Sequence, residues 1–202
     1  MFPTCFNSSA KFAALLGAGM LSLNLHAATV TLKNDQVTAT WQTHDQMLWP
    51  DSLRDAQTGQ TLALHGEPFT LLLTNGDFIH ATDFKLVGSV KEEPLPVNPD
   101  ASRFAERLPG KQLTAEMVSA DGDIHVTWHG ILRDGSRYLR QEYVFTAGKS
   151  GVPLGGITLL DTPFMGAHAT GTVDGSPVGT DTGFFGVEQP LSINRGEMGH
   201  IR

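Results

Sequence analysis

Cysteine is almost missing from this sequence of 202 residues: the single one, Cys5, lies near the N-terminus. The chain after it therefore cannot form an internal disulfide, a thiolate zinc site or a cysteine nucleophile. Basic residues are also few, since 14 lysines and arginines stand against 21 acidic residues and give a formal net charge of −7. Nucleic-acid binding needs clustered Lys and Arg to neutralise phosphates, so we expect no nucleic-acid partner.

Long apolar runs are missing as well, except at the N-terminus. There Lys11, the only charge in residues 1–27, precedes an apolar run over residues 12–25 and a small-residue end at Ala27-Ala28. The run is shorter than the roughly 20 residues that cross a bilayer as a helix, so we expect no membrane span. This order is typical of a secretory signal peptide. We therefore expect residues 1–27 to be cleaved near Ala27 and the protein to be periplasmic or secreted; a buried N-terminal helix is the alternative.

Apolar and polar residues alternate along much of the remaining chain. The period of two predicts half-buried strands rather than helices. Asn34-Asp35 and Asn75-Gly76 supply turn signals between neighbouring strands. The strands expected in this way cover residues 30–33, 37–41, 61–64, 69–74, 78–87 and 156–160.

The clearest pattern lies in residues 111–146. Ile124, Val126 and Trp128 alternate with polar residues, and Asp-Gly pairs at 121–122 and 134–135 mark turns. This order predicts an antiparallel meander. The Pro-rich residues 91–100 are expected to form a loop, because Pro removes backbone donors from a sheet. We therefore expect one all-β domain over residues 28–202, an antiparallel β-sandwich.

Residues for catalysis or metal binding are sparse. His125 and His129 are four apart on an expected strand, which separates them by about 13 Å at about 3.3 Å per residue, too far to share a metal ion. Residues 181–183, Asp-Thr-Gly, match the tripeptide of aspartic proteases. Those enzymes need two such aspartates, so a single copy would need a homodimer. We expect no metal, no cofactor and no catalytic residue; an enzyme acting through His125 and Asp181 is the alternative.

Aromatic side chains are the better candidates for binding. An aromatic ring covers the apolar C–H face of a sugar, while a nearby carboxylate accepts hydrogen bonds from its hydroxyls. Trp41 and Trp128 fall on apolar strand faces and are expected in the core. Phe184 and Phe185 lie in a Gly-rich stretch with Glu188 close behind. We therefore expect Phe184, Phe185 and Glu188 to bind carbohydrate; core positions are the alternative for the two phenylalanines.

Three segments carry a resemblance to a known family. They are residues 123–146 (DIHVTWHGILRDGSRYLRQEYVFT), 171–179 (GTVDGSPVG) and 183–190 (GFFGVEQP). Together they resemble the N-terminal galactose-mutarotase-like β-sandwich of exported bacterial glycoside hydrolases of the α-galactosidase type, some of them labelled enterotoxin. The likeness covers roughly residues 29–195.

The resemblance implies that a catalytic (β/α) barrel follows the sandwich in such enzymes. A barrel of this kind takes about 250 residues, and the sequence ends at Arg202. We therefore expect a truncated chain whose catalytic domain is missing as a partner, and a non-catalytic module with possible carbohydrate binding. Two alternatives stay open. One is a fragment of a glycoside hydrolase or other carbohydrate-active enzyme whose activity requires the missing domain; the other is a structural remnant with an exposed apolar interface.

Overall fold

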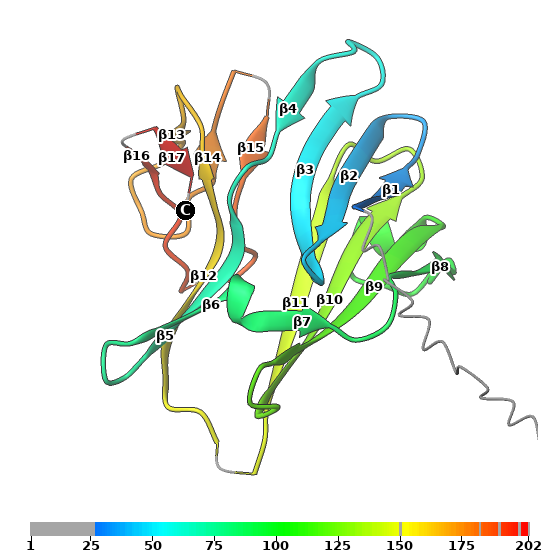
Figure 1. Ribbon diagram of the computed structural model, residues 1–202. Helices are drawn as coiled ribbons and strands as arrows, with labels where there is room; N and C mark the ends of the chain where they lie inside the picture. The colour runs from blue at the N-terminus through cyan, green and yellow to red at the C-terminus, as the bar shows by residue number, and fades with distance from the viewer. Residues whose placement is uncertain (1–26, 150, 182, 190, 198, 202) are drawn as a thin grey trace, which may run out of the picture.

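The computed structural model describes residues 27–149, 151–181, 183–189, 191–197 and 199–201 (Figure 1). The expected signal peptide lies outside the described residues, apart from Ala27. The described chain is all-β with antiparallel sheets, as the alternating pattern predicts. Its helical elements are two 3-10 turns, η1 (Ala81–Asp83) and η2 (Phe104–Arg107). Within the described part, no helix is long and apolar enough to cross a membrane.

The first sheet has the order β1-β2-β3-β4 and starts with the predicted hairpin. Val37, Ala39 and Trp41 of its second strand are buried, while the threonines between them are partly exposed. One face of the sheet therefore enters the core, as the period of two requires. The strands are β1 (Ala28–Lys33), β2 (Val37–His44), β3 (Met47–Asp55) and β4 (Thr61–Ala63).

The second sheet contains the predicted meander, in the order β11-β10-β9-β7, with β8 also paired to β9. Gly122 and Gly135 occupy the expected turns with φ angles of 79° and 71°, which suit glycine because it has no Cβ. The meander is confirmed. Its strands are β7 (Phe84–Leu86), β8 (Lys91–Leu95), β9 (Gly110–Ser119), β10 (Ile124–Arg133) and β11 (Leu139–Ala147).

The expected loop over residues 91–100 was wrong in its first half. Residues 91–95 form strand β8, which is antiparallel to β9 with Pro94 opposite Lys111. Pro94 is tolerated because β8 pairs with β9 alone and lies at the edge of the sheet, where a missing N–H breaks no ladder. An ion pair of 2.8 Å between Lys111 Nζ and Glu92 Oε1 links the same two strands.

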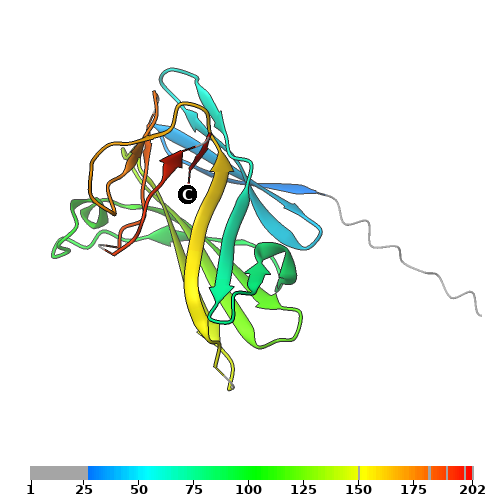
Figure 2. The same cartoon turned by 90° about the vertical axis from the view of Figure 1, so that its left-hand side faces the viewer.

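A third sheet has the order β16-β17-β12-β5-β6, and a fourth small sheet has the order β13-β14-β15. Figure 2 shows β5 and β12 side by side, with the short C-terminal strands gathered near one end of β12. The third sheet comprises β5 (Glu67–Leu73), β6 (Phe78–His80), β12 (Leu154–Pro163), β16 (Gly196–Glu197) and β17 (His200–Ile201). The fourth comprises β13 (His168–Ala169), β14 (Val178–Gly179) and β15 (Phe184–Phe185).

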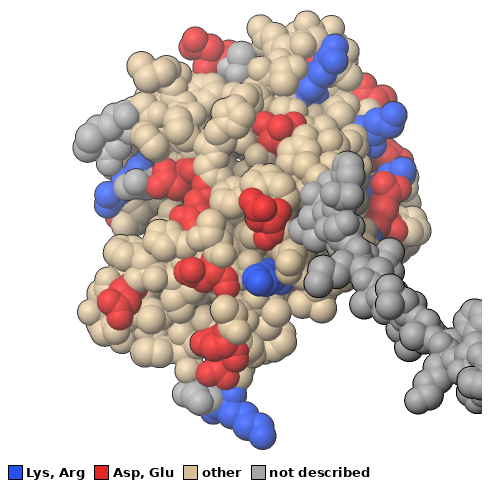
Figure 3. Space-filling model, in the orientation of Figure 1, with Lys and Arg blue, Asp and Glu red and all other residues tan. Residues whose placement is uncertain are grey.

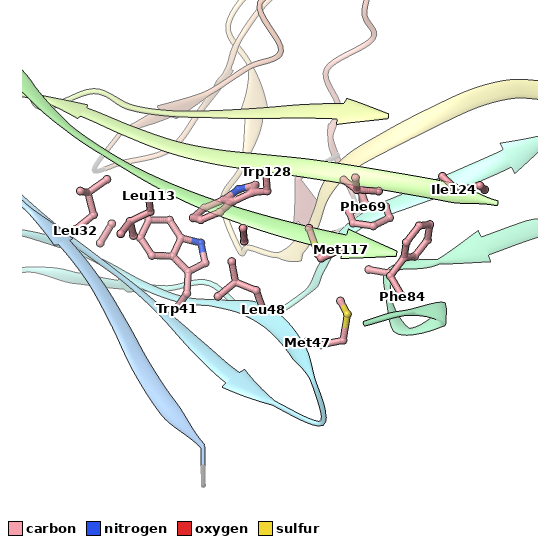
Figure 4. Close-up of a cluster of buried hydrophobic side chains, with 14 of the residues drawn as sticks. Leu32, Trp41, Met47, Leu48, Phe69, Phe84, Leu113, Met117, Ile124 and Trp128 are labelled. Carbon is pink, nitrogen blue, oxygen red and sulfur yellow. The ribbon is translucent and has the colours of Figure 1, made fainter. Parts of the chain in front are cut away.

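A single hydrophobic cluster draws side chains from the first three sheets (Figure 4). Trp41 of β2 and Trp128 of β10 meet edge to face, with ring centroids 5.0 Å apart. Phe69 of β5 meets Phe84 of β7 in the same manner at 5.1 Å. Both tryptophans are therefore core residues, as predicted, and are not available to a ligand.

Candidate functional site

A small hollow lies between η2, the β10–β11 hairpin and the segment that follows β15. Its volume is about 80 Å³. A cavity measured in this way needs about 10–15 Å³ to hold one water molecule, so the hollow has room for several waters or for one substituent of a ligand. The charged and aromatic residues that line it are Arg103, Glu106, Arg133, Tyr138, Arg140 and Glu188.

The carboxylate of Glu188 is where the polar groups of the hollow converge. Tyr138 donates its hydroxyl hydrogen to Glu188 Oε1. Arg140 Nη2 lies 3.2 Å from Glu188 Oε2, and Arg103 Nη2 lies 3.6 Å from the same oxygen. Three groups from earlier parts of the chain thus hold one carboxylate of the C-terminal segment.

Each of these two arginines also binds a second carboxylate. Arg140 Nη1 lies 2.6 Å from Glu142 Oε1, and Arg103 Nη1 lies 3.3 Å from Glu106 Oε1. Such partly exposed pairs add little to stability, because water screens them. Their effect is to fix the directions of the guanidinium groups around Glu188.

An aromatic surface adjoins this polar cluster. The ring of Phe184 is 63% exposed and lies nearly parallel to Tyr138, with an interplanar angle of 14° and 6.4 Å between centroids. That distance is within the range of offset-stacked aromatic pairs. The structure therefore presents two rings and a carboxylate together at the surface. We call Arg103, Tyr138, Arg140, Phe184 and Glu188 the Tyr138 site.

Of the three residues predicted to bind carbohydrate, the structure brings two together. Phe184 and Glu188 both contact Tyr138. Phe185 follows Phe184 in β15, and successive strand residues point to opposite faces. Its ring meets that of Phe164 instead, at 6.3 Å between centroids. Phe185 therefore lies apart from the Tyr138 site.

Sequence reasoning missed Tyr138, Arg140 and Arg103. A signal for the first two was present, because residues two apart in an extended chain point to the same side, and Tyr138, which directly precedes β11, has this spacing from Arg140 in the strand. Arg103 carried no such signal. It precedes η2, and only the connection between β8 and β9 brings it to Glu188.

The contact with Glu188 affects the ionisation of Tyr138. Burial, and then the hydrogen bond to Glu188, raise the pKa of Tyr138 to about 12. The folded state thus favours the neutral phenol. This contribution to stability is complete below the ordinary pKa of 10.0 and fades as the pH rises through about 12.

Replacing Glu188 by glutamine is expected to lower the pKa of Tyr138, because the negative charge beside the phenolate is removed. Burial still keeps that pKa above the ordinary value. Tyrosinate absorbance followed against pH measures it, and Tyr143, whose pKa is raised by burial, serves as an internal reference. Glu92→Gln is the matched control, because Glu92 pairs with Lys111 and does not line the hollow, and it should leave Tyr138 unchanged. An identical Tyr138 midpoint in Glu188→Gln would contradict the contact.

The other candidates from the sequence lie apart from this site. His125 is exposed on β10, and His129 Nδ1 lies 3.1 Å from Thr114 Oγ1. Asp181 is exposed, while Thr182 lies outside the described residues. Among the residues that the structure describes, no group of three or more His, Cys, Asp or Glu side chains could hold a metal ion.

No family model, curated protein or solved structure matches the chain. The likeness to galactose-mutarotase-like domains stays a prediction from the sequence, and function has to be inferred from the geometry of the Tyr138 site.

Proposed function

We propose that this chain is an exported, non-catalytic β-sandwich module that binds carbohydrate at the Tyr138 site. The observation that carries the proposal is the exposed ring of Phe184, parallel to Tyr138, beside a carboxylate that is held by two arginines. The resemblance to the N-terminal domains of glycoside hydrolases favours the same class of ligand.

A sugar needs two kinds of contact, and the Tyr138 site offers both. The C–H face of a pyranose packs on an aromatic ring, which Phe184 presents to solvent. Sugar hydroxyls both donate and accept hydrogen bonds. The carboxylate of Glu188 can accept them, and the guanidinium groups of Arg103 and Arg140 can donate them.

The same geometry favours binding over catalysis. Glycoside hydrolysis canonically uses two carboxyl groups on either side of the scissile bond, one of which donates a proton. Glu188 already accepts a hydrogen bond from Tyr138 and pairs with two arginines, an arrangement that suits an acceptor rather than a proton donor.

Replacing Phe184 by alanine is expected to weaken sugar binding about tenfold, which corresponds to about 1.4 kcal/mol. The loss follows from removal of the stacking surface. Isothermal titration calorimetry with a panel of neutral galactosides and galacto-oligosaccharides measures it.

The matched control is Phe78→Ala, since Phe78 is 59% exposed and lies in β6, away from the site. Its affinity should equal that of the unaltered chain. The proposal fails if no sugar of the panel binds, or if Phe184→Ala binds as tightly as the Phe78 control. Hydrolysis of a galactoside by the purified chain would contradict the non-catalytic role.

A further inference from the structure

Arginine is concentrated at the hollow of the Tyr138 site. Three of the chain's 14 basic residues, Arg103, Arg133 and Arg140, line it. On the face shown in Figure 3, acidic side chains are spread widely and basic ones stand separately. In a protein with a formal charge of −7, three arginines therefore line one small hollow together with two carboxylates, Glu106 and Glu188.

The three arginines differ in how their charge is balanced. Arg103 and Arg140 each pair with two carboxylates, as described above. Arg133 instead donates through Nη1 to two backbone carbonyls, that of Leu108 at 2.8 Å and that of Pro96 at 3.1 Å. Within the described residues it has no carboxylate at ion-pair distance. The carbonyl bonds hold the guanidinium in place without neutralising its charge.

The backbone opposite Arg133 is shaped for this side chain. Gly110 is the register partner of Arg133 between β9 and β10. A Cβ at Gly110 would lie 3.1 Å from Arg133 Cδ, and only 2.4 Å from the carbonyl oxygen of Leu132. Glycine at this position therefore allows the Arg133 side chain to pass close to the backbone of β9. The packing at Gly110 and the two hydrogen bonds of Nη1 together hold the Arg133 side chain in place.

An arginine that is held in place but not neutralised is suited to bind an anion. Its Nε and Nη2 donors have no protein acceptor within the described residues, and a guanidinium binds a carboxylate with two parallel hydrogen bonds. The hollow beside it, about 80 Å³, has room for a substituent of that size.

We propose that the Tyr138 site selects an acidic sugar, whose carboxylate enters the hollow and pairs with Arg133 while its ring packs on Phe184. This inference rests on the proposed carbohydrate binding and names the class of ligand. Uronic acid residues of a glycan carry such a carboxylate. A sulfate ester on a neutral sugar shares the anionic charge, so the test has to separate the two.

The test is calorimetry on the full chain with three probes of equal length: a galacturonate oligosaccharide, the neutral galacto-oligosaccharide and a sulfated galacto-oligosaccharide. We expect the galacturonate to bind roughly tenfold more tightly than the neutral sugar, since a hydrogen bond to a charged group contributes more than a neutral one. Added salt should weaken binding of the galacturonate and leave that of the neutral sugar nearly unchanged.

The variant Arg133→Gln should remove the preference and leave the affinity for the neutral sugar as it was. Arg107→Gln is the matched control, because Arg107 also donates to a backbone carbonyl, that of Ala101 at 2.9 Å, but does not line the hollow. Arg133→Lys keeps the charge and should retain part of the preference. If Arg133→Gln does not fold, the selectivity for an acidic sugar is tested on the unaltered chain, by the relative affinities of the three probes and by the salt dependence of galacturonate binding.

The outcomes separate this inference from the function on which it rests. Equal binding of neutral and acidic sugars, unchanged in Arg133→Gln, would overturn the acidic selectivity and leave carbohydrate binding intact. Tighter binding of the sulfated probe than of the galacturonate would overturn the choice of a carboxylate. Binding of none of the three probes would overturn both proposals.

Discussion

Replacing Trp128 by alanine is expected to lower the free energy of unfolding by about 3–5 kcal/mol, the cost of a large buried aromatic residue. Trp128 is 1% exposed and packs edge to face on Trp41. Its Nε1 also donates to Gln141 Oε1 at 3.2 Å. The neighbouring Gly130 has no side chain, and a Cβ there would lie 2.7 Å from the Trp128 ring. Alanine would thus leave a cavity between the first two sheets.

Urea denaturation of the folded chain measures this loss, and Phe78→Ala is the control. Phe78 is 59% exposed, so its removal should change the free energy of unfolding by less than about 0.5 kcal/mol. A loss below about 1 kcal/mol for Trp128→Ala would mean that the two tryptophans do not form the centre of the core.

Replacing Asn34 by alanine is expected to cost about 2–4 kcal/mol, because one side chain makes four hydrogen bonds of ordinary strength. Its Nδ2 donates to the carbonyls of Arg133 and Ser136, each at 2.7 Å. Its Oδ1 accepts from the amides of Gln36 and Val37, each at 2.8 Å. Asn34 thus ties the turn between β1 and β2 to the turn between β10 and β11.

The turn between β10 and β11 carries Tyr138. Asn34→Ala should therefore also weaken sugar binding, although Asn34 does not line the hollow. Asn75→Ala is the matched control. Among the described residues, the Asn75 side chain bonds only to Asp77 in its own exposed turn, so its loss should cost under about 1 kcal/mol and leave binding unchanged. Denaturation and calorimetry on the two variants separate the effects. Equal free energies of unfolding for Asn34→Ala and Asn75→Ala would show that the Asn34 bonds between the two turns do not stabilise the fold.

The strands could be predicted from the sequence wherever one face is buried. Val126 and Trp128 alternate with exposed or half-exposed residues in β10, so the period of two was visible and the core side could be read. Turns were equally visible, because Gly76 and Gly122 take φ angles of 92° and 79° that other residues rarely adopt. These signals are local, and they gave the meander and the first hairpin.

Strand β8 could not be predicted, because its signal is not local. Residues 91–95 contain Pro94 and little apolar surface, so nothing in them indicates a strand. Residues 91–95 form a strand because they pair with residues 110–114 of β9, whose edge is free there. A proline that breaks a central strand is harmless at an edge, and edge status depends on the whole sheet.

The candidate site likewise contains residues with a local sequence signal and residues that only the fold brings together. Phe184 and Glu188 could be chosen from their setting, a Gly-rich stretch with aromatic and acidic side chains. The residues that surround Glu188 could not, since Arg103 and Tyr138 reach it only because the C-terminal segment folds back over η2 and β11. The opposite directions of Phe184 and Phe185 follow from β15, a strand of two residues that the sequence did not reveal.

Nuclear magnetic resonance can locate the bound sugar on the folded chain. Amide shifts of a ¹⁵N-labelled sample, titrated with a galacturonate or galacto-oligosaccharide, should change at Arg103, at residues 138–140 and at residues 184–188, and stay constant along β5 and β6. Shifts confined to another surface, or none at saturating sugar, would contradict carbohydrate binding at the Tyr138 site.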